Sequence, residues 1–358
     1  MKPTRPVTAI VVNFNGGHRT LNCIESLLLQ TVPFDGVVVV DNGSSDGSVE
    51  KIAKKYPGVT VFQQRENLGL SKARNIGIRH AQTPLVLSID SDMYLRPDAL
   101  EKMLAAQVRT GAAVICPRVI FYPECTEIQC EGAEVHFTAS FLLRNTGSRN
   151  LTEVPDPLLV GGAPGGCLLL DRATTLDAGG FNELFFFYHE DVEFSLRMRC
   201  LGHDILCVAA AIVDHDRGEG TPGLSFRGTG KYPARRAHLS MRNRLIVIFI
   251  YYRVRTIVIL LPPLLLYEIG TLSLAAVRGW LREYLRAWSE IFGERREILG
   301  HRSVVQARRV RGDRQLFSAD ELTFGAGVMR RGPERMIAKT IVSLTGAYWR
   351  LTRRLLGR

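Results

Sequence analysis

The sequence predicts an α/β protein in which helices flank a doubly wound, mostly parallel sheet, followed by a C-terminal helical region that is first apolar and then basic. Two observations predict this fold. Strand and helix patterns alternate with short connections over the first 120 residues, and the composition changes at about residue 245. With 46% hydrophobic and 23% charged residues, the 358-residue chain can bury a sizeable core and is not intrinsically disordered.

The apolar pattern predicts each element in turn. Gly36–Val40 contains four consecutive valines, which is typical of a central parallel strand buried on both faces. Apolar residues spaced by three and four predict helices, and Pro97 stands at the first position of one of them, where proline is favoured. Residues 120–160 lose this rhythm and indicate an inserted loop or hairpin region. The expected strands are 7–14, 36–40, 59–63, 84–89, 111–116, 167–170 and 205–208, and the expected helices are 19–30, 46–56, 71–81, 97–110 and 191–201.

The positive charge of the chain is concentrated at its C-terminal end. The net charge is +11, and residues 278–358 alone carry 18 basic and 8 acidic side chains, so the first 277 residues are almost neutral. A basic tail suits nucleic acid or an anionic membrane surface. Residues 256–277 precede this tail and contain one charged side chain, Glu268. Anionic lipid is therefore the better partner, and we expect no nucleic acid.

The apolar region allows two membrane topologies. Residues 256–277 would span about 33 Å as a straight helix, enough to cross a bilayer core. We instead expect Pro262 and Pro263 to break the helix and allow a shallow re-entrant hairpin, with Arg253 and Arg255 reaching the headgroups. A third interpretation is a buried helix pair that packs on the rest of the chain or on a second copy. In the second case the protein would be a homo-oligomer.

The N-terminal segment and the cysteines indicate where in the cell the main domain lies. The apolar run Val7–Val12 is too short for the core of a signal peptide and is better explained as a buried strand. The seven cysteines are odd in number and form no C-x-x-C pair, which fits a reducing compartment. We expect the main domain at the cytoplasmic face of the cell membrane, with monotopic or re-entrant attachment and a single crossing as the other topology.

Carboxylates follow the predicted strands where a doubly wound sheet binds its ligands, at the carboxyl ends. Asp41 ends the valine strand, and it either accepts hydrogen bonds from a ribose or base, or caps a turn. Asp90 and Asp92 follow the strand 84–89. Two carboxylates separated by one residue suit Mg²⁺ or Mn²⁺, which take oxygen ligands and share the phosphate oxygens of a substrate.

Two cations lie in the first turn of the predicted helix 71–81. Lys72 and Arg74 oppose the helix dipole there unless an anion binds at this end. A diphosphate is such an anion. The alternative is a solvated basic face.

Acids and histidines mark the later part of the chain. Glu190 and Asp191 follow an aromatic run, so they either cap the helix 191–201 or supply a general base whose pKa is raised by desolvation. His189 is better explained as a filler among aromatic residues. His215 lies among polar residues beyond a strand and is the stronger candidate for a metal ligand.

In combination these segments resemble the family 2 glycosyltransferases, the inverting nucleotide-sugar enzymes with the GT-A fold. The resemblance covers roughly residues 7–220, and its nearest subgroup is that of the rhamnosyl- and galactofuranosyltransferases, with an H/F-E-D-V pattern and a downstream histidine. The Q-x-x-R-W motif of processive synthases is absent, which favours a single addition. The carriers are Val-Val-Asn-Phe-Asn-Gly (11–16), Val-Asp-Asn-Gly-Ser-Ser-Asp-Gly-Ser (40–48), Asn67–Gly77, Asp90-Ser-Asp92, Gly166-Cys-Leu-Leu-Leu-Asp171 and His189-Glu-Asp-Val-Glu193.

The resemblance implies roles and boundaries. Asp191 would be the catalytic base with Glu190 beside it, and Asp90, Asp92 and His215 would hold Mg²⁺ or Mn²⁺. The expected domains are a GT-A domain over residues 1–240, apolar membrane-associating helices over 241–280 and a basic helical tail over 281–358. The residues expected to bind the donor nucleotide are Asn13, Asn15, Asp41, Asn67, Lys72, Arg74 and Asp90.

The implied reaction moves one sugar from a nucleotide-diphosphate sugar to a hydroxyl of a lipid-linked glycan, in the synthesis of a cell-surface polysaccharide or glycoconjugate. A single displacement would invert the anomeric carbon. One alternative is a polyprenyl-phosphate glycosyltransferase, whose ionised phosphate acceptor needs no strong base. Another is an inactive nucleotide-sugar-binding scaffold on the membrane, against which the intact Asp90, Asp92 and Asp191 argue.

Overall fold

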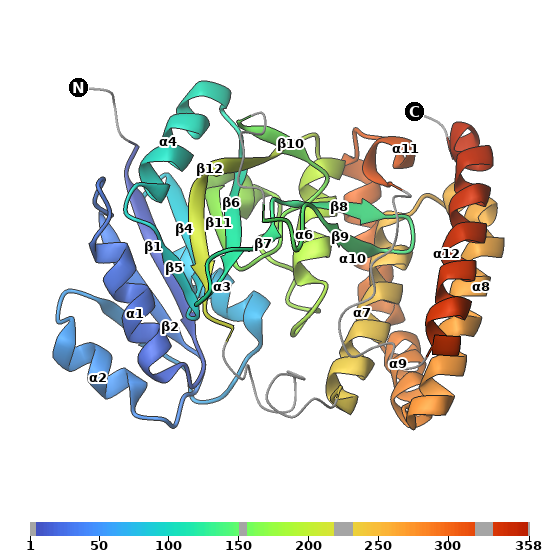
Figure 1. Cartoon of the computed structure of the whole chain (residues 1–358), viewed down its shortest axis with the longest axis horizontal. Coiled ribbons are helices and arrows are strands. Elements are labelled where there is room, and N and C mark those ends of the chain that lie inside the picture. The colour runs from blue at the N-terminus through green and yellow to red at the C-terminus, as the bar shows by residue number, and fades with distance from the viewer. Residues whose placement is uncertain (1–4, 150–155, 218–231, 319–331, 357–358) are drawn as a thin grey trace. The chain divides into compact units, whose positions relative to one another are not determined.

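The computed structural model describes residues 5–149, 156–217, 232–318 and 332–356. These residues form two compact units. The first unit comprises Met1–Ala133, Leu143–Met198 and His203–Arg217, and the second comprises Glu134–Leu142, Arg199–Gly202 and Gly218–Arg358. The first carries the large sheet, and the second consists mainly of helices (Figure 1).

The first unit is built, in the residues described, on a ten-stranded sheet with the order β10-β12-β6-β11-β4-β1-β2-β3, to which β5 and β7 add at β12 and β6. Strands β1 to β4 pair in parallel, as do β6 and β12, whereas β11 runs antiparallel between β4 and β6. The predicted mostly parallel sheet is confirmed. The strands are β1 (Val7–Asn13), β2 (Gly36–Asp41), β3 (Thr60–Gln63), β4 (Leu85–Asp90), β5 (Met93–Leu95), β6 (Val114–Phe121), β7 (Ile128–Cys130), β10 (Leu158–Val160), β11 (Cys167–Asp171) and β12 (Ile205–His215).

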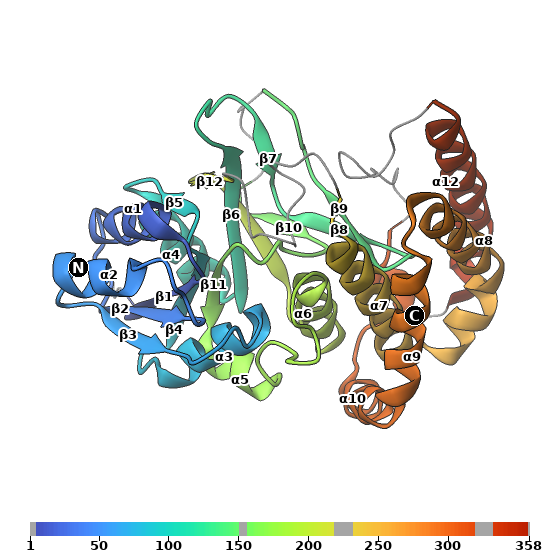
Figure 2. The ribbon, with the colours of Figure 1, turned by 90° about the horizontal axis from the view of Figure 1, so that it is seen from below.

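Alternate residues of the central strands face two helical layers. Val7, Ala9 and Val11 of β1 belong to a buried cluster with residues of α1, α2 and α4, whereas Ile10 meets Gly77 of α3 on the other side. Figure 2 shows α1 and α2 on one side of the sheet and α3 and α5 on the other. The helices are α1 (Gly17–Leu28), α2 (Ser48–Lys55), α3 (Leu70–His80), α4 (Ala99–Thr110), α5 (Arg172–Asp177) and α6 (Glu190–Cys200).

Two strands extend beyond their predicted ends, with consequences for the site. β12 continues to His215, because an irregularity between Val208 and Ile212 lets the strand keep pairing with β6. The sequence predicts that His215 lies beyond a strand. In the structure His215 is the last residue of β12, so this prediction is wrong. β6 likewise reaches Phe121, and it pairs with β7 in the region that had no predicted elements.

The second unit, in the part of the chain that the structure describes, consists of helices and most of a two-stranded sheet. Arg242 and Arg244 of α7 are buried and paired with acids. Of the described helices, α8 alone is long and apolar enough to cross a membrane, and 11% of its most apolar segment is buried. The elements are β8 (Ala133–His136), β9 (Ser140–Leu143), α7 (Ala234–Tyr251), α8 (Val254–Arg278), α9 (Leu281–Gly293), α10 (Arg295–Arg308), α11 (Asp313–Leu316), α12 (Gly332–Thr352) and the short 3₁₀ helix η1 (Arg353–Leu356).

The helix α8 runs unbroken through Pro262 and Pro263, so the predicted break at these prolines is wrong. A proline at position 263 cannot donate to the carbonyl of Ile259, four residues earlier. The hydroxyl of Tyr348, from α12, donates to that carbonyl at 2.8 Å. A tertiary hydrogen bond thus replaces the one that Pro263 removes, and the helix continues.

Candidate active site

The ends of four parallel strands place the predicted residues along one edge of the sheet. Asn13 lies opposite Asp41, and Asp41 lies opposite Gln63. Asp90, at the end of β4, lies opposite Val12. The antiparallel β11 starts at the same edge, where Asp90 N donates to the carbonyl of Gly166 at 2.8 Å. The strand ends and the turn before β11 therefore meet, as expected for a ligand site in a doubly wound sheet.

Asn13 and Asp41 form a buried polar pair beneath the first loop. Asn13 Nδ2 donates to Asp41 Oδ1 at 2.8 Å, and Ser44 N donates to Asp41 Oδ2 at 3.1 Å. Asn13 Oδ1 accepts from Thr20 Oγ1 at 2.6 Å, so that side chain is fully used inside the protein. Both side chains have no exposed surface. They fix the shape of the loop that follows β2.

Two further asparagines hold neighbouring loops. Asn15 has a positive φ of 52°, and its Oδ1 accepts from Ser45 N at 2.8 Å. Asn67 Oδ1 accepts from Gly69 N and from Asn42 Nδ2, both at 2.9 Å, which ties the loop before α3 to the loop after β2. The predicted nucleotide contacts of these residues stay predictions, and the contacts described here are structural.

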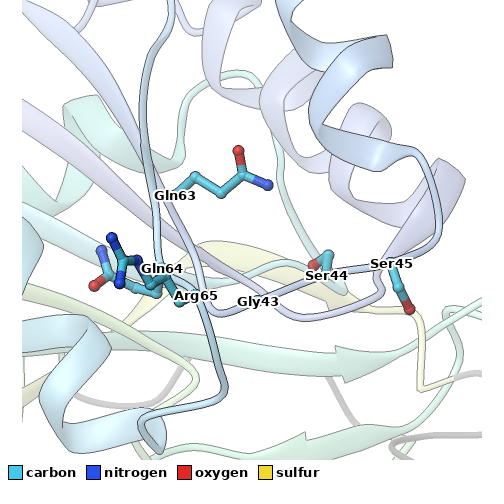
Figure 3. Close-up of a pocket in the computed structure, with 6 residues that line it drawn as sticks. All are labelled: Gly43, Ser44, Ser45, Gln63, Gln64 and Arg65. Carbon is cyan, nitrogen blue, oxygen red and sulfur yellow. The ribbon is translucent and has the colours of Figure 1, made fainter.

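A cavity of about 480 Å³ lies between these two loops, at the carboxyl ends of β2 and β3. In Figure 3 the side chain of Gln63 extends toward Ser44 and Ser45, whereas Gln64 and Arg65 point the other way. Amide, hydroxyl and guanidinium groups suit a base, a ribose or a phosphate. Sequence reasoning included Gly43, Ser44 and Ser45 in the segment 40–48 but missed Gln63, Gln64 and Arg65, although the end of the predicted strand 59–63 pointed to them. The lining residues are Gly43, Ser44, Ser45, Gln63, Gln64 and Arg65.

Lys72 and Arg74 have opposite environments. Two residues apart in a helix, they point to nearly opposite sides of α3. Lys72 is exposed, whereas Arg74 is 1% exposed and lies against the ring of Phe181. Arg74 is therefore committed inside the protein, and the predicted contact with a diphosphate stays untested for both residues.

Arg74 bridges the two acidic segments of the site. Its Nη2 donates to Asp90 Oδ1 at 2.9 Å and to the carbonyl of Gly165 at 2.8 Å, and its Nη1 donates to Glu190 Oε1 at 3.3 Å. A side chain on residue 165 would bring its Cβ within 2.8 Å of Arg74 Nη1. Glycine there lets the backbone approach the guanidinium. Desolvation raises the pKa of Asp90, and Arg74 opposes this effect while Asp92 adds to it.

Glu190 and Asp191 open α6, as predicted, and their environments differ. Asp191 Oδ2 accepts from Gly165 N at 3.3 Å, and its Oδ1 accepts from Val192 N at 2.9 Å. Desolvation raises the pKa of Asp191 against these backbone hydrogen bonds. Desolvation, with the nearby charge of Asp191, raises the pKa of Glu190 to about 7. Among the described residues, Glu190 Oε2 is buried and has no hydrogen-bond partner.

The predicted metal ligands are partly brought together. Asp90 and Asp92 keep 30% of their side-chain surface exposed, and His215 Nε2 lies 3.4 Å from Asp92 Oδ2. His215 Nδ1 lies 2.7 Å from Gln129 Oε1, an atom that can only accept, so Nδ1 donates to it and Nε2 faces Asp92. No group of three His, Cys, Asp or Glu side chains in the described ranges is close enough to hold a metal ion. Two carboxylates and an imidazole are nevertheless donors that fit Mg²⁺ or Mn²⁺.

Charged residues that the sequence did not single out hold the end of β12. Arg96 binds Asp214 through two hydrogen bonds, of 3.1 and 2.9 Å. Tyr94 donates its hydroxyl to Asp216 Oδ2 at 2.8 Å. These contacts fix the strand on both sides of His215. Gln129 belongs to β7, in the region without a predicted pattern, so no sequence signal pointed to it.

The sheet, the strand-end carboxylates and the acidic helix start are those of an α/β protein whose candidate site lies at the carboxyl ends of its parallel strands. Residues 8–157 match the family model described as "Glycosyl transferase family 2". Residues 8–157 are therefore similar to the family 2 glycosyltransferases, and the protein is a glycosyltransferase with the GT-A fold.

Relatives and a solved structure agree with this assignment. The N-acetylglucosaminyl-diphospho-decaprenol L-rhamnosyltransferase of Mycobacterium tuberculosis (strain ATCC 25618 / H37Rv) is 27% identical over 269 residues, which are 69% of this chain and 84% of that protein. The cholesterol galactosyltransferase of Borreliella burgdorferi is 29% identical over 119 residues, 32% of this chain and 33% of that protein. The crystal structure of GalNAc-T7 with UDP, GalNAc and Mn²⁺ superposes with a TM-score of 0.59 and 14% identity, over 82% of this chain and 58% of that one.

Proposed function

We propose that the enzyme transfers a single sugar, with inversion, from a nucleotide-diphosphate sugar to a hydroxyl of a lipid-linked glycan. One observation carries the proposal. The backbone of Gly165 links the two halves of the site, because its carbonyl accepts from Arg74, which holds Asp90, and its N–H donates to Asp191. The carboxylate proposed to act at the donor diphosphate and the carboxylate proposed to take a proton are thus connected through one residue.

The role of Asp191 follows from its charge and environment. An acceptor hydroxyl becomes a good nucleophile only when a base takes its proton as the bond to the sugar forms. Each oxygen of Asp191 accepts one backbone hydrogen bond and keeps a second lone pair for that proton. Burial raises the pKa of Asp191, which makes it a stronger base. Attack in line with the departing diphosphate inverts the anomeric carbon.

Asp90, Asp92 and His215 would hold Mg²⁺ or Mn²⁺ beside the donor diphosphate. When bound, such an ion neutralises the charge of the leaving group. Arg74 holds Asp90 in place, and Gln129 holds His215. The nucleotide would lie over the cavity between the loops after β2 and β3, where Ser44, Ser45 and Gln63 supply hydrogen-bonding groups.

The acceptor is inferred from the relatives and from α8. The mycobacterial relative is named for a sugar linked through a diphosphate to decaprenol, and the Borreliella relative is named for cholesterol. The exposed apolar face of α8 supports attachment to a membrane, and we place the enzyme at the cytoplasmic face, against anionic lipids. The product would enter a cell-surface polysaccharide or glycoconjugate. Transfer to a polyprenyl phosphate is the alternative, and it needs no base.

The test is a screen of nucleotide sugars with Mg²⁺ or Mn²⁺, first for donor hydrolysis and then for transfer to lipid-linked and to free oligosaccharides. We expect one donor class to react, a product of inverted anomeric configuration, and loss of activity with EDTA. A product that retains the configuration would overturn the single displacement. Sugar found on a lipid phosphate would establish the alternative acceptor.

A further inference from the structure

The outer face of α8 carries an unbroken apolar stripe. Its exposed members recur at intervals of three or four residues, which puts them on one side of the helix. They retain 38 to 67% of their surface in the described chain. We call this set the α8 stripe: Val254, Val258, Leu261, Leu265, Ile269 and Leu272. A continuous apolar surface of this length indicates a partner that removes it from water.

The hydroxyls of Thr271 and Ser273 are already satisfied within α8. Ser273 Oγ donates to the carbonyl of Ile269 at 2.8 Å, and Thr271 Oγ1 donates to the carbonyl of Tyr267 at 2.9 Å. Glu268, the one acid of α8, turns inward and pairs with Arg244. Hydroxyls bonded to their own helix need no water, so the stripe can enter an apolar medium without leaving these hydroxyls unpaired.

The opposite face of α8 packs against α7, within the second unit. Arg244 belongs to α7, and its guanidinium also lies 4.7 Å from the ring centroid of Tyr267. On the same α7, Arg242 pairs with Glu290 and Glu294. If α8 crossed a bilayer in this packing, these buried ion pairs would enter the hydrocarbon with it, at high cost. The packing therefore favours α8 lying in the plane of the membrane.

The helix α12 runs alongside α8, and both views show it (Figures 1 and 2). Ile341 of α12 comes so close to Gly270 that an added Cβ would lie 3.1 Å from its Cδ1, which shows how tightly the helices pack. Tyr348 joins α12 to the α8 backbone at Ile259. The contact places the C-terminal end of α12 near the start of α8. The helices α12 and η1 add exposed leucines of their own: Leu344, Leu351 and Leu355.

Arginines gather at this end of the helix pair. Arg255 is exposed at the start of α8. Arg350, Arg353 and Arg354 are exposed at the end of α12 and in η1. Cations beside an apolar stripe suit the phosphates of anionic lipids, each contributing up to about 1 kcal/mol near such a surface. A second copy of the chain that paired its α8 in parallel would bring the same cations together and would be repelled.

We propose that the α8 stripe, flanked by these arginines and extended by α12, is an in-plane docking surface for an anionic lipid bilayer, and that α8 does not cross it. The proposal rests on the membrane attachment proposed above and specifies the surface and its depth. The stripe lies at the boundary between headgroups and acyl chains, and the buried α7 contacts stay outside the hydrocarbon.

The first test measures binding of the full chain to vesicles of phosphatidylcholine with or without phosphatidylglycerol. Leu265→Asp and Ile269→Asp should each weaken binding about tenfold or more, the fold-change that corresponds to exposing one large apolar side chain. Leu285→Asp, at a leucine of α9 that is 59% exposed, is the matched control and should bind like the wild type. Equal losses in all three variants would overturn the choice of α8.

The second test separates charge from apolar contact. The double variant Arg353→Glu/Arg354→Glu should lose its preference for phosphatidylglycerol, and Lys51→Glu/Lys54→Glu, at exposed lysines of α2, should keep it. Sedimentation of the wild-type chain without lipid should show no self-association that the Leu265→Asp variant abolishes. Such self-association would make a second copy the occupant of the stripe.

The third test measures depth. Six of the seven cysteines are buried and Cys125 is half-buried, so Cys125→Ser gives a background of low reactivity. Arg255→Cys and Gly279→Cys, at the two ends of α8, should each react with an impermeant maleimide from the same side of sealed membrane vesicles. Reaction of one site with protection of the other would establish a crossing. Activity of Leu265→Asp on a water-soluble acceptor should be unchanged, so failure of the docking proposal is distinguishable from failure of the proposed transfer.

Discussion

Tyr348 donates its hydroxyl at 2.8 Å to the carbonyl of Ile259, the group that Pro263 leaves without a helical donor. A tyrosine on α12 thus keeps α8 continuous. Tyr348→Phe should lower the free energy of unfolding by about 1 kcal/mol, since one hydrogen bond is lost. Denaturant unfolding measures this change, and Tyr122→Phe, at an exposed tyrosine, is the control.

A double-mutant cycle can isolate the contact. In a Pro263→Ala background the backbone N–H at 263 can donate to Ile259 again. Tyr348→Phe should then cost less than it does in the wild-type chain, because the carbonyl keeps a partner. The same cost in both backgrounds would show that Tyr348 acts through packing alone.

The prolines show where a local rule fails. Pro262 and Pro263 lack the backbone N–H groups that a helix needs, so the local rule predicts that the helix ends there. The structure shows that it continues. The compensating donor stands 85 residues after Pro263, on a helix whose position depends on the packing of the whole second unit. The strands were easier to predict, because a run of valines or an alternation of apolar and polar residues indicates a strand without information from the rest of the chain.

The candidate site also contains residues that local sequence patterns predict and residues that they do not. Asp90, Asp92 and Asp191 could be found because a strand end and a helix start are local features. The burial of Arg74 could not be predicted, since it depends on Gly165, a residue 91 positions away that happens to lie against it. Gln129 lies on a strand of three residues, too short to leave a pattern.

Gln129 should support metal binding through His215. Its side-chain oxygen fixes the proton on Nδ1, which leaves Nε2 free to bind the ion. Gln129→Leu should weaken Mn²⁺ binding about 10- to 100-fold, the usual effect of removing such a support. Gln129→Glu keeps an acceptor and should retain most of the affinity. Calorimetry without donor measures both variants, and unchanged affinity in Gln129→Leu would rule out the support.

Arg74 should be a main determinant of stability in the first unit. Arg74→Ala leaves Asp90 and Glu190 without their cation, and removing one partner of a buried pair costs about 3–5 kcal/mol. Adding Glu190→Gln should recover part of this loss. Arg79→Ala, which removes an exposed pair with Glu183, should cost about 1 kcal/mol or less. Similar unfolding midpoints for both arginine variants would contradict the role of the bridge.

Glu190 should make stability fall as pH rises. Its pKa is about 7 in the folded chain against an ordinary value of 4.5, so the unfolded chain ionises first. The stabilising contribution is therefore complete below pH 4.5 and is lost progressively as pH rises to about 7. Relative to Glu190→Gln, the wild type should lose on the order of 3 kcal/mol over this range. Parallel stability profiles for the two proteins would show that Glu190 ionises normally.

Asp191 and Glu190 should differ in their effects on rate. Asp191→Asn removes the proposed base and should lower kcat about 10²- to 10⁴-fold, while donor affinity stays nearly unchanged because the base acts on the acceptor. Glu190→Gln should be milder, since Glu190 Oε1 is held by Arg74. In the wild type, the acid limb of the pH–rate profile should lie above the ordinary aspartate value of 3.8, because burial raises the pKa of Asp191. If Glu190→Gln proves the more severe change, Glu190 is the base and Asp191 positions the helix start. If both variants keep their rates, the acceptor is already ionised, as a lipid phosphate would be.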